Sequence, residues 1–402
     1  MSKFPSRFQN FLRPTPPELR TYETLFMRAV EKPTAEQAQT LKEALLHQDD
    51  LADQWTNYIG EHLTRSQAKN WVDLAFTQGI DHVYGAPEPL KNLFTQIERV
   101  PLWLDQHLLA LARKTVRRSG PLGNWLLVNV ALMGGYRYEG VIQPLLLTGK
   151  LTEYAPTRLA DTTQFVQDVL SEDGLKPKGK GISSTIRVRL LHAHIRYHLA
   201  KSPQWSVDKW GAPINQADLL ATLLLFSLSF LVTCRVMGLH FTKQEAHSVI
   251  HLWRYVGYLL GIDEHLLPST EEEARRMFYL VGKTQTLAGP EAALLGKALH
   301  EVPLQYTDGS LSKWQAKLSM KVRSAVSHLF LGDEALEHLG IPKTKLKYAL
   351  MGLIPVVYVA DGCRSKIPGL TQICTKLGGD WQDRYSASVL KRCLKNPKQS
   401  KE

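Results

Sequence analysis

Three polar residues on one predicted helix are the strongest candidates for chemistry in this sequence. In the segment Arg187-Val-Arg-Leu-Leu-His-Ala-His-Ile-Arg-Tyr-His198, residues Arg189, His192 and Arg196 are three and four positions apart and share one helical face. The flanking positions are largely apolar, so this charged stripe must face water, acidic partners or a bound anionic ligand. A haem group offers both an iron for the imidazole and two propionates for the guanidinium groups.

Spacing alone leaves other interpretations open for these histidines. A histidine in an apolar helix is more often a hydrogen-bonded core residue than a metal ligand. His194 and His198 form a second pair at helical spacing, but Ile195 stands where the zinc hydrolase motif needs a glutamate. A structural two-histidine metal site therefore remains an alternative at this stage, whereas zinc-dependent hydrolysis is not encoded.

Other common signatures of enzyme chemistry are missing from the sequence. It has no glycine-rich nucleotide fingerprint, no phosphate-binding P-loop and no G-x-S-x-G hydrolase elbow. Cys234, Cys363, Cys374 and Cys393 form neither C-x-x-C nor C-x-x-C-H, so zinc knuckles and covalent haem attachment are not encoded. Isolated cysteines of this kind predict reduced thiols in the cytoplasm.

Charge and hydropathy bear on partners and location. The 402 residues include 49 Lys and Arg against 38 Asp and Glu, which gives a formal charge of +11. The basic residues are scattered, so we expect no nucleic-acid binding but peripheral contact with anionic membranes. The N-terminus shows no apolar run of signal-peptide length, which predicts a cytoplasmic protein.

The elements that must position these residues are helices. Apolar residues recur at helical spacing almost everywhere, and no run of alternating strands is found, so we predict an all-α protein with one large helical domain. The domain is expected over residues 35–385, between a Pro-rich extension at 1–34 and a basic tail at 386–402. Predicted helices cover 35–64, 66–78, 103–118, 122–148, 158–171, 183–201, 216–237, 243–261, 270–286, 307–331, 334–340 and 344–358. The most hydrophobic stretch, Leu219 to Val232, is predicted to be a buried core helix.

Several motifs in order along the chain resemble the latex clearing proteins (rubber oxygenases) and the fungal oxygenase mpaB. The resemblance rests on Arg189-Leu-Leu-His192-Ala-His-Ile-Arg196 followed by Trp210-Gly-Ala-Pro-Ile-Asn-Gln-Ala-Asp-Leu-Leu-Ala-Thr222. Supporting matches are Gly134-Gly135, Arg158-Leu-Ala-Asp-Thr162, Trp253-Arg-Tyr-Val-Gly257 and Leu267-Pro-Ser-Thr-Glu-Glu-Glu-Ala274. The resemblance extends from about residue 120 to 290.

The resemblance implies a globin-like core, a non-covalent b-type haem and oxidative cleavage of carbon–carbon double bonds by O2. Because no export signal is visible, we expect a small hydrophobic isoprenoid or lipid-like substrate inside the cell rather than polyisoprene particles. Two alternatives stay open: a monooxygenase or peroxidase-like reaction on the same haem, and a non-catalytic protein that binds haem or a gas. A helical scaffold that has lost its cofactor belongs with the second alternative.

The resemblance also implies roles for individual residues. His192 matches the proximal iron ligand, and Arg189 and Arg196 match its two arginine neighbours. Arg158 and Thr162 match residues of the distal pocket, on the other side of the haem. The sequence thus predicts His192, Arg189 and Arg196 as cofactor-binding residues and Arg158 and Thr162 as catalytic residues.

Two further catalytic candidates match the family less well. Asp161 stands where rubber oxygenases carry a lysine, and an aspartate is not expected to bind the iron. It is expected to hold a water on the iron or to pair with Arg158; the alternative is a solvent-facing residue that begins a helix. Glu139 is the candidate for the family's distal glutamate base, with a structural partner of a nearby arginine as the alternative.

Overall fold

The chain folds into helices in all the parts that the structure, a computed structural model, describes. These parts are residues 4–8, 26–27, 30–148, 155–306 and 310–394. The only extended pairing among them is an isolated bridge between Tyr138 and Leu287. The prolines of the predicted N-terminal extension, Pro14, Pro16 and Pro17, and residues 395–402 of the predicted tail lie outside the described residues. The prediction of an all-α fold is confirmed.

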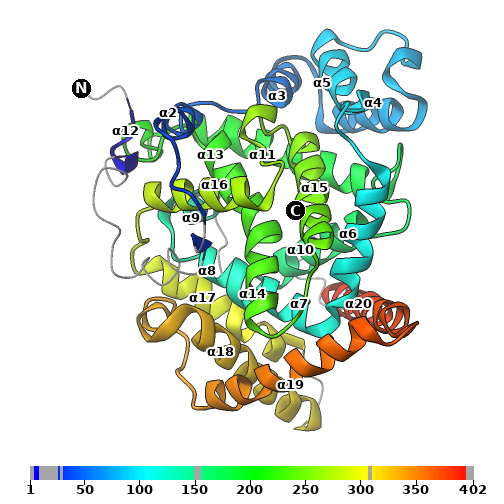
Figure 1. The fold of residues 1–402 in the computed structure, drawn as a ribbon. Helices are drawn as coiled ribbons and strands as arrows, with labels where there is room; N and C mark the ends of the chain where they lie inside the picture. Colours follow the sequence, from blue (N-terminus) through cyan, green and yellow to red (C-terminus); the bar gives the residue numbers. More distant parts are fainter. Residues whose placement is uncertain (1–3, 9–25, 28–29, 149–154, 307–309, 395–402) are drawn as a thin grey trace.

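The helices follow one another along the chain with short connections (Figure 1). The α-helices are α2 (Ala35–Ala44), α3 (Asp50–His62), α4 (Arg65–Gln78), α5 (Glu88–Glu98), α6 (Gln106–Arg118), α7 (Gly120–Leu126), α8 (Met133–Gly135), α9 (Glu139–Leu147), α10 (Ala155–Val169), α11 (Lys180–Ala200), α12 (Val207–Trp210), α13 (Gln216–Leu224), α14 (Phe230–Val236), α15 (Lys243–Leu259), α16 (Glu271–Thr284), α17 (Glu291–Glu301), α18 (Ser310–His338), α19 (Leu346–Lys366) and α20 (Leu370–Leu394). Two π-helical segments, η3 (Leu127–Leu132) and η4 (Leu225–Ser229), join α7 to α8 and α13 to α14. Short 3-10 turns are η2 (Ile80–His82), η5 (Glu264–Leu266) and η6 (Val302–Tyr306).

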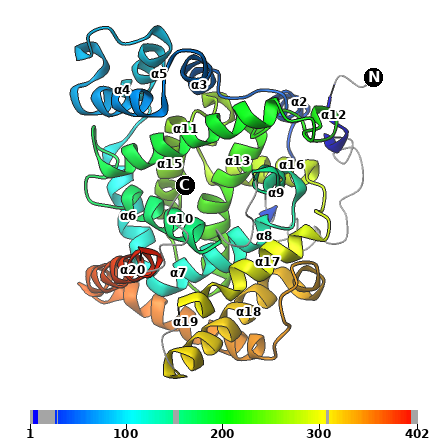
Figure 2. The ribbon, with the colours of Figure 1, turned by 180° about the vertical axis from the view of Figure 1, so that it is seen from behind.

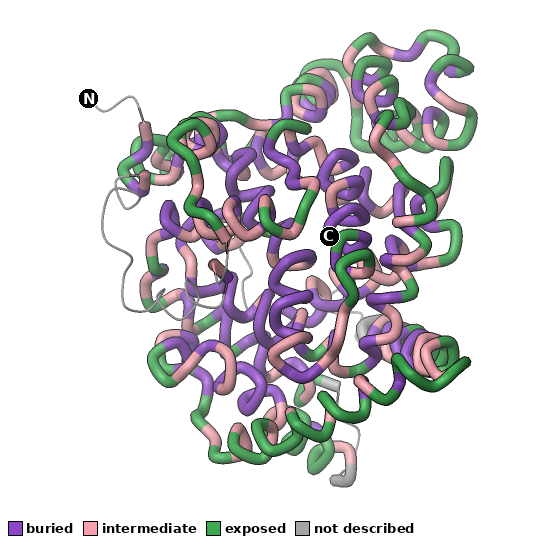
Figure 3. Tube along the Cα trace, viewed as in Figure 1, coloured by how far each residue is buried: buried purple, intermediate pink, exposed green. Residues whose placement is uncertain are grey.

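A long apolar helix made of α13, η4 and α14 runs through the middle of the molecule. Helices α3, α4 and α5 form one end, and α18 and α19 form the opposite end (Figures 1 and 2). Buried residues concentrate along the central helices, and exposed residues along both ends (Figure 3). The prediction that Leu219 to Val232 is a core helix is confirmed, because nearly all of its residues are buried.

Four helices, α5, α12, α17 and α20, were not predicted, and prolines mark the start of two of them. Helix α5 begins within Pro87-Glu88-Pro89, and helix α17 begins directly after Gly289-Pro290. Segments with such prolines and glycines usually indicate loops. Proline is nevertheless compatible with a first helical turn, because the backbone N–H that it lacks has no helical partner there. The single helix predicted over 35–64 is two helices, and the one predicted over 122–148 breaks at residues 136–138.

Helix α20 corrects the predicted start of the basic tail at residue 386. The helix continues to Leu394, and Ser386 and Val389 are buried in it. Its Gly378-Gly379 pair is a dipeptide typical of loops, but here these glycines let α20 cross α6 closely. A Cβ atom at Gly378 would lie 2.3 Å from the carbonyl oxygen of Arg117. The pair therefore marks a tight helix crossing rather than a loop.

A buried ion pair fixes the described N-terminal residues to the start of α13. Asn215 caps this helix by accepting a hydrogen bond from the backbone N–H of Asp218. The Asp218 carboxylate accepts two hydrogen bonds from Arg7, of 2.9 and 2.8 Å. Further along, Phe26 is buried and its ring lies 4.5 Å from that of Phe278 in α16. The segment from Trp210 to Thr222, on which the family resemblance partly rests, thus has a structural role through Asn215 and Asp218.

The π-helical turn η3 faces a buried polar cluster on α17 and α18. Arg323 donates a 3.0 Å hydrogen bond from Nε to the side-chain oxygen of Asn129, and Ser324 Oγ lies 3.4 Å from His300 Nε2. Both Arg323 and His300 are buried. Burial, with the nearby charge of Arg323, lowers the pKa of His300 to about 4. His300 is therefore neutral in the folded protein at pH 7.

We predict that His300→Gln makes stability less sensitive to acid. The unfolded chain protonates this histidine near its ordinary pKa of 6.5, whereas the folded protein does so near 4. The folded state thus loses stability as pH falls from 6.5 towards 4, by at most about 3 kcal/mol for this residue. Urea unfolding across this range should give a shallower pH slope for His300→Gln than for the unaltered protein. Exposed His82, replaced by Gln, is the control; equal slopes in all three proteins would contradict the prediction.

Candidate active site

Helix α11 carries the predicted charged stripe and packs between α3 and α10. Its buried positions include Ile186, Arg189, Ala193 and Arg196, which recur every three or four residues along one face. The apolar members of this face provide packing, whereas the arginines need partners. The structure confirms the predicted helix, and the acidic partners of its stripe come from α3.

Arg189 is held by the most complete set of contacts at this interface. Its Nε and Nη2 atoms donate to the two carboxylate oxygens of Asp49, over 2.7 and 2.8 Å. Its Nη1 atom donates to Gln96 Oε1 in α5 over 2.6 Å and to the backbone oxygen of Leu259 over 3.3 Å. Asp49 also caps α3 by accepting from the N–H of Ala52. Because Arg189 and Asp49 are buried, their pair locks α11 to α3, and the bond to Gln96 adds a contact with α5.

Arg196 also binds α3, mainly through Asp53 in the first turn of that helix. Its Nε donates to Asp53 Oδ1 over 2.7 Å, and its Nη2 lies 3.7 Å from Asp49 Oδ2. Burial raises the pKa of the Asp53 carboxyl to about 6, against the opposing effect of Arg196. Both arginines of the stripe are thus engaged by aspartates in this structure, rather than left for the propionates that the sequence suggested. Asp49 and Asp53 were missed by sequence reasoning, although buried arginines require such partners.

His192 lies between the two arginines on α11. The residue is partly buried, and its Nδ1 atom is buried without a hydrogen-bond partner. Burial in the packed helices, together with the charge of Arg196, lowers the pKa of His192 to about 4 against the opposing effect of Asp49. A neutral imidazole has a free lone pair on one ring nitrogen, which is the form that binds metals. The ring therefore lacks the hydrogen bonds expected of a purely structural core histidine.

Helix α10, which packs against α11, brings together the three predicted distal residues Arg158, Asp161 and Thr162. The Nη2 atom of Arg158 lies 3.4 Å from the hydroxyl oxygen of Tyr136, and its Nε atom is buried without a partner. Burial raises the pKa of Tyr136, against the opposing charge of Arg158, so the phenol stays protonated. Tyr136 was not among the predicted site residues.

Asp161 does not form the predicted pair with Arg158. Its side chain is exposed, and no ion pair involving it occurs among the described residues. The protein around it nevertheless raises the pKa of its carboxyl. Its other predicted role, holding a water, stays a prediction.

Glu139 begins α9 and is buried, but it is already paired. Its Oε1 atom lies 2.6 Å from Lys209 Nζ, and its backbone N–H donates to the oxygen of Thr286. The partner is thus a lysine of α12 rather than the arginine considered from the sequence. A glutamate in this pair can act as a base only when the lysine moves or shares its proton.

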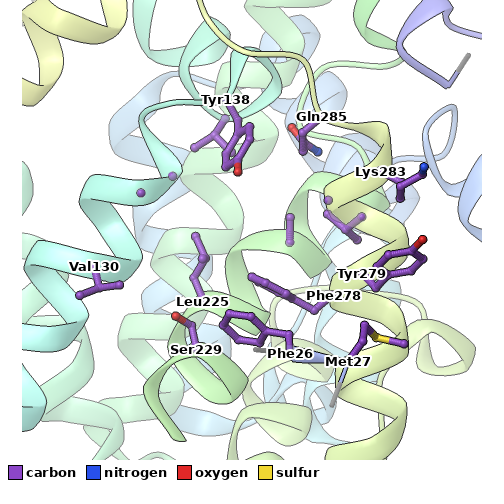
Figure 4. Close-up of a pocket in the computed structure, with 16 residues that line it drawn as sticks. Phe26, Met27, Val130, Tyr138, Leu225, Ser229, Phe278, Tyr279, Lys283 and Gln285 are labelled. Atoms are coloured by element: carbon purple, nitrogen blue, oxygen red, sulfur yellow. The ribbon is translucent and has the colours of Figure 1, made fainter. Parts of the chain in front are cut away.

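Two apolar pockets adjoin these elements. The first is lined by aromatic and aliphatic side chains of α9, α13, η4 and α16, with Tyr138, Lys283 and Gln285 at its polar edge (Figure 4). The second is lined by Thr162 and by residues of η3 and η4. Gly135, Val141 and Leu225 contribute to both, so one thin wall separates the pockets. Both π-helical segments face this space, as π-bulges often do at functional sites.

His194 and His198, the alternative metal pair, lie on the exposed side of α11. Their Nε2 atoms are 3.2 Å apart, and no other group joins them into a set of three or more potential metal ligands within the described residues. The desolvation of His194 and the nearness of His198 lower the pKa of His194. The two rings can hydrogen-bond to each other, a contact that needs no metal.

The family comparison brings these observations together. Residues 122–357, more than half of the chain, match the family described as ER-bound oxygenase mpaB/B'/Rubber oxygenase, catalytic domain. The chain belongs to this family. Membership in the mpaB/rubber oxygenase family indicates an oxidoreductase of the oxygenase type. The helices that carry Glu139, Arg158 and His192 all lie within the matched segment.

Two known proteins of this group are similar to the chain. The rubber oxygenase of Streptomyces sp. (strain K30) is 24% identical over 267 residues, which cover 64% of this chain and 62% of that protein. The chain thus matches less than two thirds of the length of this relative. The structure of latex clearing protein in the closed state superposes with a TM-score of 0.65 at 19% identity, covering 84% of this chain and 91% of the other. This likeness shows the fold; the globin-like core stays a prediction.

We predict that Asp49→Ala is among the most destabilising single substitutions in the protein. It leaves Arg189 buried without its bidentate partner, which costs about 3–5 kcal/mol in comparable buried pairs. Chemical unfolding should report this loss in free energy of unfolding. The neighbouring Asp50→Ala, at an exposed position in the same first helical turn, should cost about 0.3–1 kcal/mol. Equal losses in the two variants would show that the pair does not hold the helices together.

Proposed function

We propose that this protein is a haem b-dependent oxygenase that uses O2 to cleave a carbon–carbon double bond in a hydrophobic isoprenoid or lipid-like substrate. The observation that carries the proposal is the neutral, unpartnered imidazole of His192, which lies within the family's matched segment. Membership in the oxygenase family and the two apolar pockets, one of them lined by α10, support it. In such a cleavage the two atoms of one O2 end in the two carbonyl products, so that no external reductant is required.

The residues at His192 fit a haem iron. His192 offers a nitrogen that has no hydrogen-bond partner, and its lowered pKa keeps it unprotonated at neutral pH. A bound haem would supply the redox-active iron that activates O2. Arg189 and Arg196 contribute by holding the ligand helix against Asp49 and Asp53, so their predicted cofactor-binding role becomes a positioning role in this proposal.

The remaining residues act on the substrate side in this proposal. Arg158, oriented against Tyr136, places positive charge next to the pocket that Thr162 lines. Asp161 offers an exposed acceptor on the same helix and holds a water. Glu139 accepts an allylic proton from the substrate once its ion pair with Lys209 has opened. The apolar pocket walls bind the hydrocarbon and exclude bulk water.

One observation favours a second candidate function, the non-catalytic binding of haem or a gas. The predicted base Glu139 is occupied by Lys209, and neither residue lines the two apolar pockets described above. A haem protein without a free distal base would bind ligands and yet not turn over substrate. Dioxygen uptake coupled to carbonyl products separates the two functions, and a monooxygenase would instead need a reductant for each turnover.

We predict that the purified protein contains about one b-type haem per chain and that His192→Ala loses it. Removing the axial ligand should release a non-covalent cofactor while the helices remain, as judged by circular dichroism. Pyridine haemochrome analysis and the Soret band measure the haem. His198→Ala, on the exposed side of the same helix, is the matched control and should keep a full complement. A full haem complement in His192→Ala would transfer the ligand role to His194 or His198.

We also predict that alanine substitutions at Arg158 and Arg189 impair different properties, turnover in the first case and haem occupancy or stability in the second. Arg158→Ala should retain haem and thermal stability but lose turnover by about 100-fold or more, because it removes charge beside the reacting groups. Arg189→Ala should lower haem occupancy or stability instead, because it leaves Asp49 without its bidentate partner. Arg158→Lys, which keeps the charge, should restore part of the activity. Loss of haem in Arg158→Ala, together with normal haem content but lost turnover in Arg189→Ala, would overturn this division of roles.

A further inference from the structure

Helix α19 presents an apolar surface that the rest of the described protein leaves uncovered. Only Asp361 and Arg364 of its 21 residues are buried, although the helix is long and apolar enough to cross a membrane by length and composition. The helix made of α13, η4 and α14 passes the same test, but most of it is buried in the core. The two helices therefore have similar compositions and opposite environments.

The exposed side of α19 contains no charged residue over more than three helical turns. Every side chain from Tyr348 to Ala360 is apolar or aromatic. The large exposed members are Tyr348, Met351, Leu353, Val356, Tyr358 and Val359. Exposed Ile367 beyond the end of the helix, with Ile373 and Leu377 on α20, extends this surface. Apolar patches of this size on soluble proteins mark interaction sites.

A hydrogen bond on the opposite side holds α19 against the protein. Asp361, which also pairs with Arg364 of its own helix, accepts a 2.8 Å hydrogen bond from the backbone N–H of His240. The ring of His240 lies 4.3 Å from that of Tyr358. Gly238 allows close packing, because a Cβ atom there would lie 2.7 Å from the backbone nitrogen of Tyr358. These contacts favour a helix that stays docked while its outer side meets a partner.

The charges around the apolar surface indicate the kind of partner. Basic residues flank it at both ends, and between residues 343 and 377 the one acidic residue is the buried, paired Asp361. The basic residues are Lys343, Lys345, Lys347, Arg364, Lys366 and Lys376. Lys343 and Lys347 contact acidic groups of α18, and Arg364 is buried, which leaves exposed Lys345, Lys366 and Lys376. Two copies of this chain would bring these like charges together, so the arrangement does not suit self-association.

We propose that α19 lies in the surface of an anionic lipid bilayer, with its apolar side among the acyl chains and its lysines at the headgroups. An apolar helix side flanked by basic residues binds at this interface, and Tyr348 and Tyr358 suit the boundary between headgroups and acyl chains. The docked side keeps the helix parallel to the membrane rather than across it. The site is independent of the proposed haem chemistry, since none of its residues lines the apolar pockets.

The first test is flotation of the purified protein with liposomes of phosphatidylcholine containing phosphatidylserine. The protein should float with these vesicles, bind pure phosphatidylcholine more weakly and lose binding as salt rises. The double variant Val356→Glu and Val359→Glu should lower the partition coefficient about tenfold or more. Val100→Glu with Leu102→Glu, two exposed apolar positions between α5 and α6, is the matched control and should bind normally. Circular dichroism and thermal melting check that all variants fold.

A fluorescent probe separates the remaining possibilities. An NBD group attached to Val356→Cys, in a chain with Cys363, Cys374 and Cys393 replaced by Ser, should brighten on vesicle addition. Nitroxide lipids labelled near the headgroup should quench it more than those labelled at the bilayer centre. Stronger quenching at the centre would show a spanning helix and overturn the proposal. So would unchanged flotation of the double glutamate variant, or a change from dimer to monomer in that variant without any binding to lipid.

Discussion

The buried contact between Asp49 and Arg189 is the constraint on which the arrangement of the site depends. Helix α11 carries two arginines on its buried face, and a buried guanidinium that loses its anionic partner is costly. Asp49 meets this requirement at the start of α3, where the chain turns from α2, and it also caps α3. The position of α3 and the orientation of α11 are therefore settled by one carboxylate.

The same constraint creates an unusual environment for His192. The arginines that need the aspartates also place positive charge around the imidazole, while burial removes the water that would stabilise a second charge. The ring is kept neutral by its surroundings rather than by a hydrogen bond. On the opposite helix, Asp161 replaces the lysine that the resemblance implies, whereas Lys209 of α12 contacts Glu139.

Local patterns in the sequence predicted the helices well, but not the partners of their polar groups. The face with Arg189, His192 and Arg196 follows from helical spacing alone. Asp49 could not be identified as its partner, because it lies 140 residues away and inside a segment that was predicted to be one continuous helix. Sequence spacing reports neighbours along a helix, whereas the ion pairs of this site join elements that only the tertiary fold brings together. Helix α20 also depends on a tertiary contact, since its Gly378-Gly379 pair lies against Arg117 of α6.

The ion pair between Arg7 and Asp218 joins residues 211 positions apart and so has a consequence for the order of folding. During synthesis Arg7 emerges well before its acceptor, which follows it by 211 positions. The entropy lost in closing so long a loop is recovered only after the central helix has formed. Phe26 and Met27 of the same N-terminal region line the first apolar pocket. One wall of that pocket is therefore supplied by a segment that lies far before the other walls in the sequence.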